Sequence, residues 1–359
     1  MNKNKYCLSF LASLAVLPLQ VSADSAPMEQ QQVVPLSTGE PLNKCNPSTP
    51  GYFYPAEYKL CDHTDLFVTA DFLYWSHNQM SGTNVLANRV RDTATTEHSL
   101  ALMRVSGYRP AFKVGVGTGL PGYDNWKIEA DYIWYHHKTG TNFSAEAPDV
   151  IIPYENGAFT ASHLKSTFKT QYNIIDLKVG RPFYLSRRLI IDPFFGIRGF
   201  WTTDTEKLRF NLIPGGNIPP GSLFVSTTIA KFWGIGPHVG FDLKGLIKWG
   251  VYLVGKSAFT VAYQKTERLT HISRPLSSVI PFQVDSIAEP KFMQVQSMLD
   301  SSIGLGWGDY FGNRNCHFDF AVTYDYIAHL LIGLNNIFVD YVENHYYFQG
   351  LTFKAQLNF

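Results

Sequence analysis

Hydrophobic and polar residues alternate in ten separate segments of this chain, the last of which runs to its C-terminus. In residues 346–359, for example, Leu351 and Phe353 lie on one face of an extended chain, and Thr352 and Lys354 lie on the other. A period of two residues is typical of a β-strand. The pattern predicts an all-β protein with strands in residues 66–74, 112–117, 126–135, 175–180, 189–198, 233–243, 249–263, 299–307, 317–326 and 346–359.

A closed barrel in a membrane explains this alternation better than a soluble sheet does. After residue 23, no stretch approaches the roughly 18 apolar residues that a membrane-spanning helix requires. A closed barrel turns its apolar face to lipid and its polar face to the lumen, and it leaves no unpaired strand edge in the membrane. We expect a transmembrane antiparallel β-barrel of about ten strands, or twelve if a long connection contains another hairpin.

The connections between the predicted strands alternate between long and short. Long segments follow the odd-numbered strands, at 77–107, 139–167, 202–232, 264–294 and 327–345, and short segments follow the even-numbered strands, at 119–125, 181–188, 244–248 and 308–315. Outer-membrane barrels have short periplasmic turns and long extracellular loops. The alternation predicts that the first strand leaves the periplasm and that both chain termini lie there.

The N-terminal 23 residues have the features of a secretory signal peptide. Lys3 and Lys5 precede a largely apolar run at 7–19, and small residues follow at 21–23. The next segment, 24–64, is rich in Gln, Pro and Ser and has no hydrophobic period. We expect three regions: a signal peptide (1–23), a periplasmic arm (24–64) and the barrel (65–359).

Composition agrees with a barrel in a cell envelope. Aromatic residues make up 15% of the chain and charged residues only 16%, which suits aromatic girdles and an uncharged lipid face. The net charge of +1 and the absence of a basic run argue against nucleic acid as a partner. In an oxidising compartment Cys45 and Cys61 can form a disulfide, which leaves Cys316 either free or available to another chain.

The polar faces of the predicted strands carry many charges, which we expect to line the lumen. Nine acidic and five basic side chains form this set: Asp71, Lys113, Lys127, Glu129, Asp131, Asp176, Lys178, Asp192, Arg198, Asp242, Asp300, Asp319, Asp325 and Lys354. They can form a packed network of ion pairs, or they can line a water-filled pore with a slight preference for cations. Inward glycines such as Gly117 and Gly306 either leave room for water or let the strands bend.

No motif in the sequence indicates an enzyme, so we do not expect catalytic activity, a cofactor or a metal site. Residues 250–257 match the GxxxxGK[ST] pattern, but bulky strand-forming residues fill the variable positions and no amphipathic helix follows. No GxSxG motif and no CxxC or HxxxH pair occurs in the sequence. An outer-membrane hydrolase is therefore the function that the sequence favours least.

Four segments resemble the Legionella-type major outer membrane protein family, which also occurs in chlamydia-related bacteria. They are Asp71-Phe72-Leu73-Tyr74-Trp75, Phe112–Gly117 leading to Asn125-Trp126, Asp192–Gly199, and the stretch from Asp319 to Tyr324 together with the terminal Phe359. The resemblance covers about residues 66–359. It implies a pore-forming protein of the outer membrane that can also act as an adhesin, and it supplies no catalytic residue.

These observations predict a porin through which ions and small hydrophilic solutes diffuse passively. The main alternative is a non-conducting structural or adhesive barrel whose loops bind a host surface. Expected partners are the lipid of the bacterial outer membrane, the permeating solutes, a possible second copy of the chain, and the assembly machinery that recognises a C-terminal aromatic residue such as Phe359.

Overall fold

The computed structural model describes residues 66–79, 85–91, 99–103, 107–120, 126–146, 149–153, 160–186, 188–215, 218–276, 285–289, 291, 293–311, 316–331 and 346–359. The predicted signal peptide, the N-terminal arm and the Cys45–Cys61 pair lie outside these residues. Every helix or strand element in the described part of the chain is a β-strand. It contains no helix that is long and apolar enough to cross a membrane.

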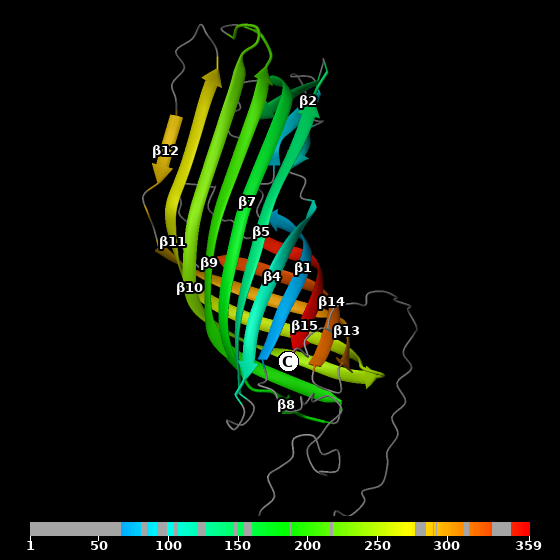
Figure 1. The fold of residues 1–359 in the computed structure, drawn as a ribbon. Helices are drawn as coiled ribbons and strands as arrows, with labels where there is room; N and C mark the ends of the chain where they lie inside the picture. The colour runs from blue at the N-terminus through cyan, green and yellow to red at the C-terminus, as the bar shows by residue number, and fades with distance from the viewer. Residues whose placement is uncertain are drawn as a thin grey trace, which may run out of the picture.

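Ten antiparallel strands close into a barrel, which confirms the predicted fold and strand number (Figure 1). In ring order they are β4 (Tyr108–Gly119), β1 (Leu66–Gln79), β15 (Tyr346–Asn358), β14 (Cys316–Leu331), β13 (Met293–Phe311), β11 (Val251–Leu276), β10 (Leu223–Lys248), β9 (Leu189–Leu212), β7 (Ala161–Gly180) and β5 (Lys127–Ser144). Pairing of β4 with β5 completes the ring. The first and last strands are neighbours, and backbone hydrogen bonds join Leu66 to Phe359 in both directions.

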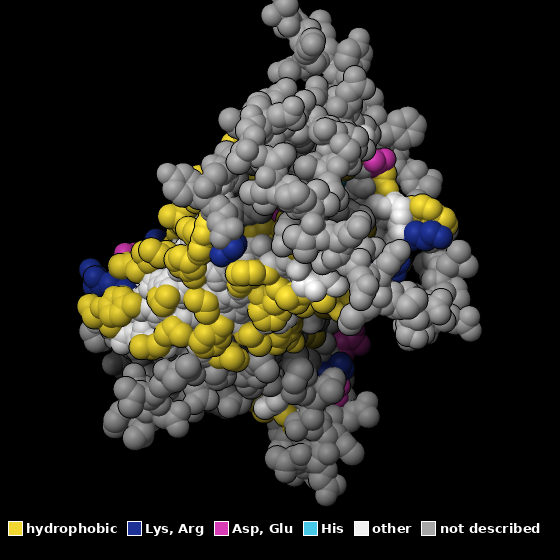
Figure 2. Space-filling model, turned by 90° about the horizontal axis from the view of Figure 1, so that it is seen from below, with side chains coloured by type: hydrophobic (Ala, Val, Ile, Leu, Met, Phe, Trp, Pro, Cys, Tyr) yellow, Lys and Arg dark blue, Asp and Glu magenta, His cyan; other side chains and the backbone are white. Residues whose placement is uncertain are grey.

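The two faces of the ring strands differ as the sequence period predicts. On β9, Phe195 and Ile197 are exposed, whereas Phe194 and Arg198 are buried inside the barrel. Hydrophobic side chains gather side by side on the outer surface of the barrel when it is seen from below (Figure 2). Exposed aromatic side chains lie toward both limits of this apolar zone, with Trp307 near the short turns and Trp201 and Trp233 toward the extended end of β9 and β10. This distribution is that of a lipid-facing surface with two aromatic girdles.

Several ring strands are longer than their sequence pattern indicates. β7, β9, β10 and β11 have 20, 24, 26 and 26 residues, and they rise on one side of the barrel as a tall curved sheet (Figure 1). Much of the expected long connections at 139–167, 202–232 and 264–294 is thus strand rather than loop. We call this end of the barrel the extended end.

Further strands attach to the ring without entering it. They are β2 (Val85–Arg91), β3 (Ser99–Met103), β6 (Asp149–Pro153), β8 (Phe183–Tyr184) and β12 (Asp285–Glu289). A long connection does contain a hairpin, β2–β3, yet the ring still has ten strands. A second hydrophobic core, which includes Leu164, Phe210 and Phe224, packs at the extended end. The extended end therefore has a hydrophobic core of its own.

The predicted short turn at 244–248 is wrong, because β10 continues through Lys248. The chain reverses instead at Trp249 and Gly250, which both have positive φ angles of 54° and 76°. Two consecutive positive φ angles are what a tight two-residue hairpin of type I′ requires. The indole of Trp249 is 82% exposed, at the end of the barrel where the short turns and the C-terminus lie.

Candidate functional site in the barrel lumen

The predicted lumen residues all lie on ring strands, and none of them is exposed on the barrel surface. With Lys244 and Lys256 added, every one of the ten strands contributes at least one charged side chain to the interior. We call these sixteen side chains the charged belt. The sequence did not identify Lys244 as a lumen residue because it lies in the segment expected to be a turn. It did not identify Lys256 because the pattern of the seventh predicted strand left open which residues face inward.

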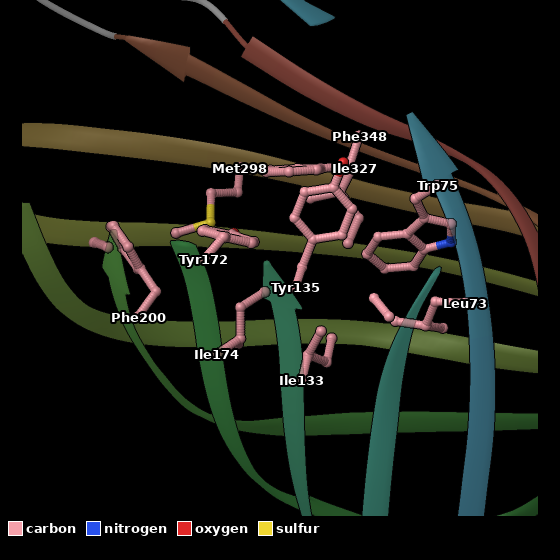
Figure 3. Packing of buried hydrophobic residues seen from close by; sticks show 12 residues of the cluster. Leu73, Trp75, Ile133, Tyr135, Tyr172, Ile174, Phe200, Met298, Ile327 and Phe348 are labelled. Carbon is pink, nitrogen blue, oxygen red and sulfur yellow. The ribbon is translucent and has the colours of Figure 1, made fainter. Parts of the chain in front are cut away.

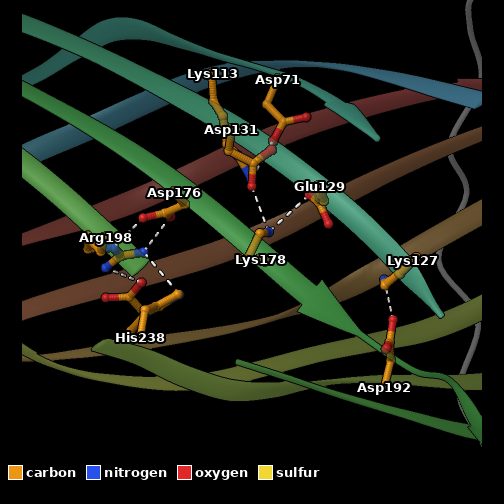
Figure 4. A network of polar contacts seen from close by, with 11 residues as sticks. Asp71, Lys113, Lys127, Glu129, Asp131, Asp176, Lys178, Asp192, Arg198 and His238 are labelled. Carbon is orange, nitrogen blue, oxygen red and sulfur yellow. Dashed lines mark hydrogen bonds and ion pairs between the residues drawn. The ribbon is translucent and has the colours of Figure 1, made fainter. Parts of the chain in front are cut away.

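One half of the charged belt is built around two lysines, Lys113 on β4 and Lys178 on β7, which flank strand β5 (Figure 4). Nζ of Lys113 lies 3.1 Å from a carboxylate oxygen of Asp131 and 3.9 Å from one of Asp71. Nζ of Lys178 lies 2.6 Å from Asp131 and 3.0 Å from Glu129. Asp131 thus bridges two cations that come from β4 and β7, on either side of its own strand β5.

The other half is centred on Arg198, which is almost completely buried. Its guanidinium donates two hydrogen bonds to Asp176, at 2.7 and 2.8 Å, and a third nitrogen lies 2.7 Å from Asp300. Nε2 of His238 is 3.4 Å from the same guanidinium, and Nδ1 of His238 is 2.8 Å from the hydroxyl of Thr260. This group joins five consecutive strands of the ring, β7, β9, β10, β11 and β13. Figure 4 shows Arg198 with Asp176 and His238.

Further contacts extend the charged belt toward the short turns. Lys127 pairs with Asp192, and Nζ of Lys244 lies 3.0 Å from Asp319. Farther from the short turns, Asp325 accepts hydrogen bonds from the hydroxyls of Thr323 and Thr352 at 2.7 and 2.6 Å. Asp242 and Lys354 lie half-buried on the inward faces of β10 and β15, as predicted.

Several buried polar atoms of this region have no hydrogen-bond partner among the described residues. They include side-chain oxygens of Asp192, Asp300, Ser302 and Thr69. A buried polar group without a partner is costly, and in proteins ordered water commonly supplies the missing hydrogen bonds. The charged belt therefore has the chemistry of a hydrated region.

The inward glycines do not leave open space. A Cβ atom at Gly117 would collide with the ring of Phe67, and one at Gly306 would collide with the ring of Tyr252. Each pair is directly opposite across two strands. These glycines make room for an aromatic ring, so the expectation that they make room for water is wrong at both positions.

An apolar layer lies next to the charged belt on the side of the extended end. On β5, Ile133 and Tyr135 follow Asp131 at the next inward positions, and on β7 Ile174 and Tyr172 precede Asp176 in the same way. The layer contains Leu73, Trp75, Ala111, Ile133, Tyr135, Tyr172, Ile174, Phe200, Ala262, Met298, Ile327 and Phe348 (Figure 3). We call this set the aromatic layer.

Side chains of the aromatic layer meet across the barrel axis. The rings of Tyr172 and Phe348 stack with centroids 4.6 Å apart, and those of Tyr135 and Phe348 meet edge to face at 5.1 Å. The phenol oxygen of Tyr172 lies 2.6 Å from Nε2 of His329. These contacts fill the centre of the lumen at this depth. Sequence reasoning placed Tyr172 and His329 outside the strands and so did not assign them to the lumen.

The described residues show no arrangement that points to a metal site. No group of three His, Cys, Asp or Glu side chains within the described ranges is placed to hold a metal ion. The polar side chains of the lumen instead pair with one another over several strands. This arrangement can bind water and small ions.

Comparisons with known proteins agree with an outer-membrane barrel. A family model described as "Legionella pneumophila major outer membrane protein precursor" matches residues 58–359. No curated protein matches the sequence.

Three solved structures are among those to which this chain is similar. The outer membrane protease OmpT from Escherichia coli has 11% identity and a TM-score of 0.40, with 82% of this chain and 97% of that chain covered. A Pseudomonas aeruginosa FadL homologue has 9% identity and a TM-score of 0.24, with 83% and 90% covered. The toluene transporter TodX of P. putida has 8% identity and a TM-score of 0.18, with 83% and 89% covered. Similarity at this level carries no information about function.

Proposed function

Because this chain belongs to the Legionella major outer membrane protein family, we propose that it is a narrow channel for small ions. The family and the closed barrel fit a protein of the bacterial outer membrane. The observation that carries the proposal is the charged belt, to which all ten ring strands contribute. Ionisable side chains at membrane depth are costly, and in membrane proteins they commonly mark the path of an ion.

A structural role alone does not account well for so many interior charges. Replacing buried ion pairs by well-packed apolar residues is often neutral or stabilising, so sixteen interior charges need a further reason. The buried oxygens of Asp192 and Asp300 without a protein partner favour water in this region. A hydrated belt of both signs can replace part of the water shell of a passing ion.

The aromatic layer sets the upper size of what can pass. With Tyr172, Phe348 and His329 in contact across the axis, the lumen is closed at this depth in the described conformation. Conduction then requires these side chains to change rotamer, and hydrophobic constrictions in channels gate by excluding water. We therefore narrow the expected cargo from small hydrophilic solutes in general to small ions.

The experiment is a planar-bilayer recording of the purified, folded mature protein in a salt gradient. The proposal predicts discrete conductance events of low amplitude and a non-zero reversal potential. Folding is checked first by circular dichroism and by the heat-dependent electrophoretic migration typical of barrels. A folded protein that shows no events over a wide voltage range defeats the proposal.

The contact between Tyr172 and His329 across the lumen favours a second candidate function. In this alternative the barrel is closed to ions and presents the extended end to the outside. In that case the folded extension, with Leu164, Phe210 and Phe224 in its core, is the functional part. The two candidates differ in one result. A closed barrel conducts only after the aromatic layer is truncated, whereas a channel conducts without any substitution. Adhesion to a host surface, self-association and hydrolase activity are further hypotheses, which we rank below these two candidates.

A further inference from the structure

Five basic side chains cluster on the outward face of the extended end. Lys138 on β5, Lys165 and Lys169 on β7, and Lys207 and Arg209 on β9 are all exposed. We call them the basic patch. They lie on the faces of β5, β7 and β9 that, farther down the same strands, carry the lipid-facing residues.

The basic patch begins just beyond the aromatic girdle. On β5, Lys138 is two outward positions past Trp134, or roughly 13 Å along the strand at about 3.3 Å per residue. On β9, Lys207 follows Trp201 on the same outward face. The neighbouring strands continue the trend, because Lys231 is the next outward residue after Trp233 on β10. The patch therefore starts roughly 13 Å past the girdle on β5 and ends at Arg209, roughly 26 Å past Trp201 on β9, at about 3.3 Å per residue. It extends outward from the edge of the lipid-facing surface, on the side where head groups lie.

Strand register places like charges directly opposite one another in this patch. Lys138 pairs with Lys169 across β5 and β7, and Lys165 pairs with Arg209 across β7 and β9. Lys207 is diagonal to both Lys165 and Lys169 in the same register. Like charges directly opposite across two strands are destabilising, so a sheet does not gain from this arrangement by itself.

The described acidic residues do not neutralise the patch. On β9, Asp204 and Glu206 occupy the alternate positions to Lys207 and thus lie on the inward face. In the described part of the chain, no ion pair joins the five basic side chains to a carboxylate. A set of unneutralised cations beside lipid calls for an external anion.

We propose that the basic patch binds the phosphate groups of glycolipid head groups in the outer leaflet around the barrel. The position beside the lipid-facing surface favours a lipid over a soluble anion. Arg209 can hold a phosphate through two parallel hydrogen bonds, and the lysines supply point charges around it. Thr167 and Asn142, opposite Lys207 and Lys165, add polar groups between the cations. This inference uses the outer-membrane location and does not depend on ion conduction.

The test measures lipopolysaccharide binding to the full mature barrel in neutral detergent. The patch variant is Lys165→Gln with Lys169→Gln. The control is Lys248→Gln with Lys291→Gln, which removes the same charge from two exposed lysines outside the patch. At about 1 kcal/mol per basic side chain near an anionic lipid surface, the patch variant loses about 2 kcal/mol, or roughly 30-fold in affinity. The control variant keeps the wild-type affinity.

Three further arms separate the lipid from other anions. Dephosphorylated lipopolysaccharide is expected to bind the wild-type barrel as weakly as intact lipopolysaccharide binds the patch variant. Raising the salt concentration should weaken wild-type binding more than binding of the patch variant, because exposed charges are screened. Equal affinity of the patch and control variants overturns the proposal, and so does equal affinity for the dephosphorylated lipid. Heparin that binds as tightly as lipopolysaccharide would assign the patch to a soluble polyanion and overturn it as well.

Discussion

The phenol of Tyr172 and the imidazole of His329 form a 2.6 Å contact between strands that stand opposite each other in the ring. β7 and β14 are five strands apart in either direction around the barrel. A direct side-chain contact over that span means that the barrel is narrow enough for its interior to be filled by side chains, as a small ring allows. The contact of Tyr172 with His329 is therefore one place where side chains bridge the lumen from opposite strands.

Truncation of the aromatic layer should open the lumen. Tyr172→Ala removes the ring that stacks on Phe348 and the hydroxyl that meets His329. We expect the mean single-channel conductance in planar bilayers to rise severalfold. Tyr172→Phe is the matched control, because it keeps the ring and removes only the hydroxyl. Equal conductance of the alanine variant and the wild type would show that this layer does not limit flow.

Loss of the buried guanidinium should destabilise the barrel. Arg198→Met leaves the carboxylates of Asp176 and Asp300 facing each other inside the barrel without their cation. Breaking a buried ion pair on one side costs about 3–5 kcal/mol. Urea unfolding in lipid vesicles should show a decrease of that size in the free energy of unfolding.

A compensating variant separates charge from packing at this site. Adding Asp176→Asn and Asp300→Asn to Arg198→Met removes the unpaired charges, so part of the lost stability should return. If the triple variant is as unstable as Arg198→Met alone, the effect comes from lost packing rather than from electrostatics.

Neutralising three carboxylates should change the ion selectivity. With Asp71→Asn, Glu129→Gln and Asp131→Asn, Lys113 and Lys178 lose their partners and the lumen becomes more positive. The reversal potential in a potassium chloride gradient should then shift toward anion preference.

The matched control for selectivity changes charge outside the lumen. Asp309→Asn removes an exposed carboxylate from β13 and should leave the reversal potential unchanged. A reversal potential that stays constant in the folded triple variant would mean that ions do not pass the charged belt.

The hairpin at Trp249 and Gly250 should tolerate no side chain at its second position. Gly250 has a φ of 76°, and a Cβ atom there would collide with the carbonyl oxygen of Gly308. We expect Gly250→Ala to lower the free energy of unfolding by about 1–3 kcal/mol, the cost of a strained backbone conformation. Gly245→Ala is the control, since its nearest atom, Cβ of Leu253, would be 3.8 Å away. Equal stability of the two variants would refute this account of the turn.

The sequence predicted the inward direction of the charges well and their mutual contacts poorly. Asp131 and Lys178 were assigned to the lumen because a period of two fixes which face a residue occupies. Their 2.6 Å contact depends on the register between β5 and β7, which a single strand pattern does not contain. The same limit applies to Arg198 and Asp300, which come from strands that are three places apart in the ring.

Strand ends were the least predictable feature. On β7, from Tyr172 toward the extended end, the strand continues where the outward residues turn polar, as at Gln171 and Lys169. The lipid-facing alternation of apolar residues ends there, although the ladder of backbone hydrogen bonds goes on to Leu212 on β9. The aromatic layer and the basic patch both lie on such continued strands, and so they became visible only in the structure.

The most direct test of the central claim is the single-channel conductance of the wild-type protein, measured in a planar bilayer beside the triple variant of Asp71, Glu129 and Asp131. If the charged belt is an ion path, the wild type conducts and the variant shows an altered reversal potential. Absence of conductance from a folded wild-type barrel, together with conductance after Tyr172→Ala, would contradict it and identify a closed barrel instead.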